Sequence, residues 1–476
     1  MEKAVSHRQA VHANLSNPSM RAALRQSLHL IWQGRQKTLQ HFTAWEKLRD
    51  EAYAVKQYAL EHLPQLLEQF EKQARKNGMQ VHYASNVADA CATVYDIIKA
   101  HDVKLVVKGK SMVSEEIELG AYLKARGVEL KASDVGDLVV YLTGEPPVHI
   151  LGPAMHYDRY QIGRIFAKHL HVPEEHDVHK LNAIARNNLR QDFYGLKLGL
   201  SGVNFAAAKE GALWLIENEG NGRMCTTAPD VHVAICGIEK LTASLDDAAV
   251  LAQIVGPSAN AQYSPAYGNI ITGPRRVGEL DGPREVHVIL LDNGRSQMLA
   301  DPDFYAALRC IRCSACMNMC PVFDKIGGHA YLTTYPGPIG TVISPLMDNF
   351  IRQGHLLSLC SQCKRCAQMC PVKIPLPQLI LKLRARLNQE SEHPTVTPQP
   401  FRRRAQKIIF KLFTKAAVNP TLWHTLMNKS YAANFLLQLF GKFVPPTATW
   451  SRYRQLPQLS NKLERELTQL KGITIE

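Results

Sequence analysis

Two cysteine runs with one shared spacing constrain this chain more than any other feature. Each reads Cys-x-x-Cys-x-x-Cys-x-x-x-Cys-Pro, and the second lies 50 positions after the first. Their cysteines are Cys310, Cys313, Cys316, Cys320, Cys360, Cys363, Cys366 and Cys370. This spacing is typical of proteins in which three close thiolates hold one [4Fe–4S] cluster and the fourth reaches a second cluster. The sequence therefore predicts two [4Fe–4S] clusters.

The crossover rule predicts that the two runs exchange their last ligands. It assigns the first cluster to Cys310, Cys313, Cys316 and Cys370, and the second cluster to Cys360, Cys363, Cys366 and Cys320. Zinc is the alternative, because structural zinc also binds four cysteines in Cys-x-x-Cys pairs. The repeated spacing with its closing proline favours iron. Because eight of the 11 cysteines lie in these runs, we expect metal thiolates in a reducing compartment, not disulfides.

Four basic residues adjoin the cysteines: Arg309, Arg312, Lys364 and Arg365. They could raise the reduction potentials of the clusters by favouring the extra negative charge. They could equally be solvated surface charges. Since potentials of such clusters span roughly −700 to +450 mV, the direction of electron flow stays open.

The pattern upstream of the runs predicts two regions. Residues 1–78 show helical spacing of apolar residues, with Ser19 as the expected cap of a helix that starts near Met20 and a stop at Asn77. Residues 79–295 alternate short apolar segments with helical stretches, which predicts an α/β domain with a largely parallel sheet. The expected strands are 79–84, 103–109, 128–134, 147–154, 212–218, 231–237 and 285–293.

Two loops of the α/β region are candidate sites, because ligands bind at the carboxyl ends of parallel strands. One runs from Lys108 through Lys110 to Ser111 and could hold an anion, although a plain capped turn is the alternative. The other contains Glu219 and Asn221. Outside the runs, Cys91 and Cys236 lie in apolar segments and are expected to be buried, whereas Cys225 has a polar context that leaves reactivity open.

The remaining chain divides into residues 296–390, a predicted α-helical ferredoxin-type domain, and residues 391–476, a predicted helical basic tail. From residue 371 onward there are 17 Lys and Arg against 5 Asp and Glu, so most of the net charge of +14 lies there. A cationic amphipathic helix near 401–420 suits an anionic membrane surface or packing on the protein. No nucleic-acid fold signature accompanies it.

No apolar run suits a signal peptide or membrane span, which predicts a cytoplasmic protein, with possible peripheral contact at the inner face of the membrane.

Several motifs together resemble a known family. The segments ALRCIRCSACMNMCPVFDKIGGHAY, TYPGPIGTVISPL, NEGNGRMCTT, VHVAICGIEKL and LLDNGRS are similar to those of the lactate utilization protein B (LutB, YkgF-type) family. The resemblance implies an α/β domain of the LUD type, related to sugar-phosphate isomerase (NagB/RpiA) and CoA-transferase folds, followed by a two-cluster ferredoxin domain. It also implies an electron-transfer component that works with LutA-like and LutC-like partners in oxidising L-lactate to pyruvate.

Two segments depart from the family pattern, 132–137 and 208–211. If they form a pocket, its ligand differs here, whereas the cluster ligands show no departure. The alternative function is a self-contained oxidoreductase with a substrate pocket near Lys108, Lys110, Glu219 and Asn221. Against it, the chain lacks a dinucleotide fingerprint of Gly-x-Gly-x-x-Gly with an acidic partner. The sequence thus leaves open whether the protein is an enzyme in its own right.

Overall fold

The computed structural model describes residues 6–390 and 400–430. The chain forms two compact units, Met1–Glu390 and Ser391–Glu476. Residues 391–399 and 431–476 of the predicted basic tail lie outside the described residues. The finer boundaries expected after residues 78 and 295 fall inside the first unit and stay predictions.

The first unit opens with four helices, as the apolar spacing predicted. They are α1 (His7–Leu15), α2 (Pro18–Leu39), α3 (Trp45–Glu61) and α4 (Leu63–Lys76). The expected cap Ser19 is wrong, because α2 begins at Pro18 and the side chain of Asn17 accepts a hydrogen bond from the Met20 amide at 3.0 Å. Proline suits the first helical position, where its missing N–H is not needed. The predicted stop at Asn77 is confirmed.

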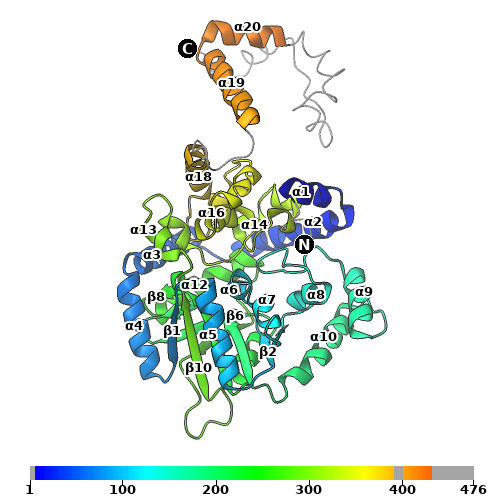
Figure 1. Cartoon of the computed structure of the whole chain (residues 1–476), viewed down its shortest axis with the longest axis vertical. Coiled ribbons are helices and arrows are strands. Elements are labelled where there is room, and N and C mark those ends of the chain that lie inside the picture. Colours follow the sequence, from blue (N-terminus) through cyan, green and yellow to red (C-terminus); the bar gives the residue numbers. More distant parts are fainter. Residues whose placement is uncertain (1–5, 391–399, 431–476) are drawn as a thin grey trace. The chain divides into compact units, whose positions relative to one another are not determined.

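A six-stranded sheet, all of whose paired strands run parallel, organises the α/β region (Figure 1). Its order is β1 (Gln80–Ala84), β10 (Glu285–Leu291), β7 (Val231–Gly237), β4 (Leu198–Gly202), β2 (Leu105–Lys108) and β3 (Glu129–Ala132). A second sheet of four strands has the order β8 (Leu241–Thr242), β5 (Phe205–Ala207), β6 (Ala212–Glu217) and β9 (Tyr267–Ile271). The predicted fold class, α/β with a largely parallel sheet, is confirmed.

The inner strands β7 and β10 are buried on both faces, which explains why they read as continuous apolar runs. In β7, Val233 and Ile235 pack in one core cluster with α5 (Val87–Ala100), whereas Ala234 and Cys236 pack in another with α4. This alternation follows from the two-residue period of a strand.

One predicted strand is wrong and one central strand was missed. Residues 147–154 form turns, because three prolines flank or interrupt the segment and His149 Nδ1 accepts hydrogen bonds from the Leu151 and Gly152 amides. The missed strand is β4, whose apolar run is broken by glycine. Gly199 is required there, since an added Cβ would lie 2.0 Å from the Cys225 carbonyl oxygen.

Further helices surround the sheets. They are α6 (Met112–Glu116), α7 (Leu119–Lys124), α8 (Val135–Thr143), α9 (Arg159–Leu170), α10 (Val178–Phe193), α11 (Asn221–Thr227), α12 (Leu245–Ala259) and α13 (Arg295–Ala300). The cysteine region adds α14 (Ala315–Asn318), α15 (Phe323–Ile326), α16 (Gly337–Met347), α17 (Arg365–Met369) and α18 (Leu376–Glu390). It has no strand among its described residues, as expected for a helical ferredoxin-type region. One apolar cluster joins it to α2, α3 and α12.

The described part of the second unit consists of α19 (Pro400–Ala417) and α20 (Pro420–Ser430), which contact each other through Phe413 and Trp423. Among the residues that the structure describes, no helix has the length and apolar character needed to cross a membrane.

Candidate functional site

The two cysteine runs share a backbone conformation as well as a spacing. The φ angle is 59° at both Arg312 and Ser314 in the first run, and 57° and 64° at the equivalent Gln362 and Lys364 in the second. Non-glycine residues keep such left-handed angles only where their surroundings hold them. Each run then enters a short helix, α14 or α17, at the same repeat position.

Cys370 of the second run lies beside three cysteines of the first run. Burial raises the pKa of Cys313, and the nearby thiols of Cys370 and Cys310 raise it further. Burial also raises the pKa of Cys316, with Cys310, Cys313 and Cys370 among its neighbours. We call Cys310, Cys313, Cys316 and Cys370 the first thiol group. All four residues are buried, with 6–8% of their surface exposed.

Cys320 of the first run lies among the other cysteines of the second run. Burial, together with the nearby thiols of Cys360 and Cys363, raises the pKa of Cys320 to about 11 and that of Cys366 to about 12. These four cysteines, the second thiol group, line a small cavity of about 20 Å³. Unlike the first group, this one reaches the surface, because Cys363 is exposed.

The thiol groups fit iron–sulfur clusters by their donor chemistry. All 11 cysteines are free, so each group offers four sulfur donors in one place. Backbone amides also donate to sulfur, among them Arg312 to Cys310 and Gln362 to Cys360 at 3.4 Å, and Ile374 to Cys370 at 3.3 Å. Hydrogen bonds to a thiolate favour its charged, metal-binding form.

The four basic residues near the cysteines divide into two pairs. Lys364 and Arg365 are exposed, so the interpretation as solvated charges holds for them. Arg309 is only 4% exposed and stacks over the Tyr53 ring at 4.4 Å, while the Arg312 side chain is 9% exposed. The two arginines of the first run are therefore buried charges beside the first thiol group.

A buried ion-pair network ties the first run to the parallel sheet. Arg295 Nη2 lies 2.8 Å from Glu116 Oε2, and its Nε donates to Glu239 Oε2 at 2.5 Å. Arg312 Nη2 completes the network at 3.2 Å from Glu239 Oε1. Although burial opposes the charge, these guanidinium groups hold the pKa of Glu239 at about 2. Sequence reasoning missed the network, although Glu239 and Arg295 lie within four residues of the carboxyl ends of the neighbouring buried strands β7 and β10.

A cavity of about 450 Å³ lies at the carboxyl ends of β2, β3, β4 and β6, and we call it the strand-end cavity. Its polar lining combines residues of the sheet loops with others from η1 (Ile238–Lys240) and the first cysteine run. This lining includes Lys110, Ser111, Asp134, His149, Ser201, Asn204, Glu217, Asn218, Glu219, Asn221, Lys240, Arg312 and Tyr335.

Both loops predicted as candidate sites border the strand-end cavity, but one predicted residue faces elsewhere. Lys110, Glu219 and Asn221 line it. Lys108 does not; its ammonium group lies 2.7 Å from Glu115 Oε1 and 3.3 Å from Asp137 Oδ2. The prediction that Lys108 lies at a pocket is thus wrong, because two buried carboxylates hold it.

The charged groups at this end of the cavity shift one another's pKa values. Burial would raise the pKa of Asp137, but the ammonium groups of Lys110 and Lys108 lower it. Burial raises the pKa of Asp134. Partial burial and the Asp134 charge raise the pKa of Glu219 to about 7, although its carboxylate accepts a hydrogen bond from the Val135 amide. Glu219 can therefore exchange a proton near neutral pH.

The remaining cysteines and the departing segments contribute little to the cavity. Cys91 and Cys236 are buried, as predicted. Burial raises the pKa of Cys225 to about 12, so this thiol stays protonated and the reactive alternative is wrong. Of the segments that depart from the family pattern, 132–137 supplies Asp134 to the lining and 208–211 supplies none.

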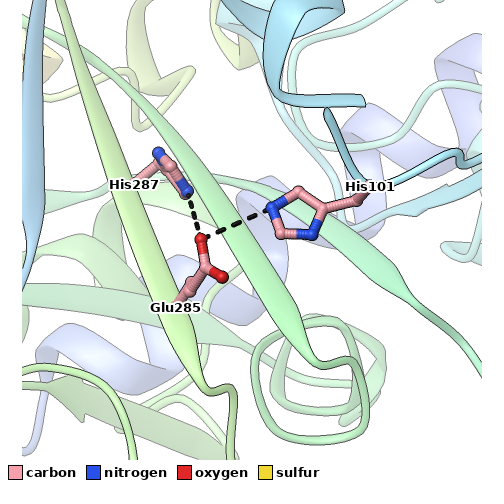
Figure 2. Close-up of side chains that lie close together, drawn as sticks. All are labelled: His101, Glu285 and His287. Carbon is pink, nitrogen blue, oxygen red and sulfur yellow. Dashed lines mark hydrogen bonds and ion pairs between the residues drawn. The ribbon is translucent and has the colours of Figure 1, made fainter. Parts of the chain in front are cut away.

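A histidine group that sequence reasoning missed lies away from the cavity. Figure 2 shows His101, at the end of α5, turned toward Glu285 and His287 of β10. Glu285 Oε2 lies 3.4 Å from Nε2 of each imidazole. His101 is distant in the sequence from Glu285 and His287, which are two positions apart, so no local motif predicts the group. Glu145, His156 and His329 form a second such group.

Comparison with known proteins places these features in two domains. Residues 67–291 match the LUD domain, and residues 306–374 match the 4Fe-4S dicluster domain. The lactate utilization protein B of Exiguobacterium is 35% identical, over 95% of this chain and 95% of its own length.

Two other relatives agree with this assignment. The electron transport protein YkgF of Escherichia coli is 35% identical, with 94% of this chain and 93% of its own length covered. The lactate utilization protein B of Oceanobacillus iheyensis is 36% identical, over 88% and 86% respectively. Since these likenesses span nearly the whole chain, it belongs to the lactate utilization protein B family.

Proposed function

We propose that the protein is the iron–sulfur electron-transfer component of a complex that oxidises L-lactate to pyruvate. The two groups of four thiols are the observation that carries this proposal. The names of the relatives support both the lactate system and the electron-transfer role. Bound [4Fe–4S] clusters would supply one-electron transfer. Oxidation of lactate to pyruvate releases two electrons and two protons, so a pair of one-electron centres suits the reaction.

The proposal assigns one cluster to each thiol group. Cys310, Cys313, Cys316 and Cys370 would hold the first cluster, and Cys320, Cys360, Cys363 and Cys366 the second. The proximity of Cys370 to the first run and of Cys320 to the second supports this exchange. Because the first group is buried and the second includes the exposed Cys363, we further propose that the second group faces the external electron partner.

Iron and sulfide counting tests the cofactor content. After anaerobic reconstitution, we expect about eight iron and about eight acid-labile sulfide per chain, as two [4Fe–4S] clusters require. The Cys91→Ser variant is the matched control and should keep this content, since Cys91 belongs to α5 and packs in the core away from both runs. A colourless protein with bound zinc and no sulfide would overturn the assignment.

The proposed partners are LutA-like and LutC-like subunits. The lactate utilization names of the relatives support their existence but not their stoichiometry. Anaerobic co-purification from the native host is the test. Recovery of the chain alone, with its full iron content, would contradict a stable complex.

A self-contained oxidoreductase is the second candidate, and the strand-end cavity favours it. The cavity combines buried cations with Glu219, whose pKa of about 7 suits proton transfer. Anaerobic addition of L-lactate to the purified, cluster-loaded chain separates the two functions. Bleaching of the visible absorbance without partners would support the self-contained enzyme, whereas no bleaching until partners are added would support the electron-transfer component.

We also propose that the basic tail docks the protein on an anionic membrane surface. In α19, Ile409, Phe410 and Phe413 are exposed beside the basic residues Lys411 and Lys415. An apolar face with flanking cations is suited to the membrane interface. The protein would then lie in the cytoplasm and meet the inner face of the membrane through this tail.

A further inference from the structure

Two buried cations face the strand-end cavity from the side of the first cysteine run. Lys240 is 6% exposed, and Arg312 Nη1 has no hydrogen-bond partner among the described residues. The two lie near each other, since the Arg312 charge adds to burial in lowering the pKa of Lys240. Their neighbour Glu239 is shared with Arg295, and the thiol of Cys310 is another nearby group that can carry negative charge. The unused donor of Arg312, beside a second buried cation at the cavity wall, indicates that an anion binds there.

The other walls limit the charge of that anion. Asp134, Glu217 and Glu219 also line the cavity. The Glu217 carboxylate accepts hydrogen bonds from the Gly222 and Arg223 amides at 2.6 Å. Carboxylates around a ligand repel polyphosphates and dianions far more than a single carboxylate. At about 450 Å³ the cavity falls within the range of small-molecule sites.

We propose that the strand-end cavity binds a small 2-hydroxy or 2-oxo monocarboxylate, whose carboxylate is held by Arg312 and Lys240. The choice of a hydroxy or oxo acid rests on the proposed function, whereas the requirement for a monocarboxylate rests on the cavity alone. Arg312 lies between Cys310 and Cys313 in the sequence and donates its backbone amide to Cys310. The bound acid would therefore lie beside the first thiol group.

Calorimetric titration of the anaerobic, cluster-loaded full-length chain tests this site. We expect saturable binding of L-lactate and pyruvate and weaker binding of inorganic phosphate. Lys240→Met should weaken lactate binding at least about tenfold, because it removes a charge-assisted hydrogen bond. Lys209→Met removes an exposed lysine of the same domain and is the matched control, with no change expected.

A second variant separates the site from the cysteines that flank it. Arg312→Lys keeps the charge but loses the planar pair of donors, so it should weaken binding while the iron content stays normal. Absence of carboxylate binding in a chain with full iron content would overturn this inference and leave the electron-transfer proposal standing. Carboxylate binding by a chain that cannot hold iron would support this inference and contradict the electron-transfer proposal. Tighter binding of phosphate than of lactate would refute the monocarboxylate assignment.

The histidine group in Figure 2 carries a second, independent inference. Glu285 Oε2 lies 3.4 Å from His101 Nε2 and from His287 Nε2, which is long for a hydrogen bond. In a tetrahedral site with bonds of about 2.0–2.1 Å, neighbouring ligand atoms lie about 3.4 Å apart. The spacing thus matches two edges of a zinc coordination sphere, and all three ligand atoms lie within 4.8 Å of one another.

The second imidazole nitrogen of His287 is also placed as a metal ligand requires. His287 Nδ1 lies 3.0 Å from His82 Nε2 on the neighbouring strand β1. Such outer hydrogen bonds fix the ring orientation of metal-binding histidines. We infer that His101, Glu285 and His287 bind Zn²⁺, with solvent completing the coordination.

Titration of Zn²⁺ into the cluster-loaded chain tests this inference, because the clusters then occupy the eight cysteines of the runs. We expect one site that His101→Ala and His287→Ala each remove. His179→Ala, which changes an exposed histidine of α10, is the control and should keep the site. Zn²⁺ binding that both His101→Ala and His287→Ala leave unchanged, or no binding at all, would refute the site.

Discussion

At the residue scale, the chemistry of this protein depends on which thiols meet. The cysteine spacing predicts that the two runs exchange their last ligands, and the structure brings Cys370 beside Cys313 and Cys320 beside Cys366. Single side chains also determine the lining of the strand-end cavity. Lys110 and Lys108 are two positions apart, but only Lys110 lines the cavity. Neighbouring side chains on a loop point in different directions, so proximity in sequence does not define a site.

Paired substitutions test the exchange of ligands between the cysteine runs. Because Cys310 and Cys370 belong to one thiol group, the double variant Cys310→Ser with Cys370→Ser should lose about half of the iron. Cys360→Ser with Cys370→Ser takes one ligand from each group and should lose nearly all of it. Iron analysis after anaerobic reconstitution measures both. The opposite pattern would show that each run holds its own cluster.

The pKa of Glu219 predicts a pH dependence of carboxylate binding. This pKa is raised to about 7, so Glu219 becomes charged as the pH rises through neutrality. It faces Asp134, Asp137 and Lys110, and its new negative charge opposes an anionic ligand. Lactate affinity should therefore fall severalfold between about pH 6 and about pH 8. Calorimetry on Glu219→Gln should show no such fall, and a dependence that survives this change would contradict the role of Glu219.

At the scale of elements, the strands could be predicted wherever they read as uninterrupted apolar runs. β7 and β10 were found because both of their faces are buried. β4 was missed because it contains two glycines, although it pairs with β7 and β2 in the middle of the sheet. Gly199 is required because α11 packs closely against it, and the sequence of the strand alone does not predict that contact.

A glycine substitution tests this account of β4. Gly199→Ala places a Cβ against the Cys225 carbonyl and should lower the free energy of unfolding by about 1–3 kcal/mol, as overpacked cores do. Gly120→Ala in α7 is the matched control, because a Cβ there meets nothing within 4 Å and alanine favours a helix. Urea denaturation of both variants measures the difference, and equal stability of the two would contradict the packing argument.

At the scale of the whole molecule, buried charge and a shared core join the cysteine region to the sheet. Arg295, Glu239 and Glu116 are almost fully buried, and Arg312 connects them to the first run. The apolar cluster around the cysteines extends into α2, α3 and α12. This continuity is why the first 390 residues form one compact unit.

Removing the central cation of this network should be costly. Arg295→Met leaves Glu239 and Glu116 buried without their main partner, and a broken buried pair costs about 3–5 kcal/mol. We expect a loss of this size in urea denaturation at neutral pH. Arg284→Met, which removes an exposed ion pair with Asp230, should change stability by less than about 1 kcal/mol. Comparable losses in the two variants would argue against the network.

Truncation tests the role of the second unit. A chain that ends at residue 390 should keep the iron content and fold of the full chain, because the first unit has its own core. It should lose binding to vesicles that contain anionic lipid, which co-sedimentation measures, if the basic tail is the membrane anchor. Vesicle binding that survives the truncation would exclude the tail, and binding equal on neutral vesicles would exclude an electrostatic contact.

The sequence by itself determined the eight candidate cluster ligands and the α/β class, because cysteine spacing and apolar periodicity are local patterns. Tertiary structure alone decided that Arg312 is buried beside a cavity, that Lys108 is held away from it, and that Glu239 and Arg295 link the sheet to the cysteines. These outcomes depend on which strand ends and loops meet in space. Parallel strands bring residues that are distant in the sequence to one edge of the sheet, and a local sequence pattern does not predict which of them become neighbours.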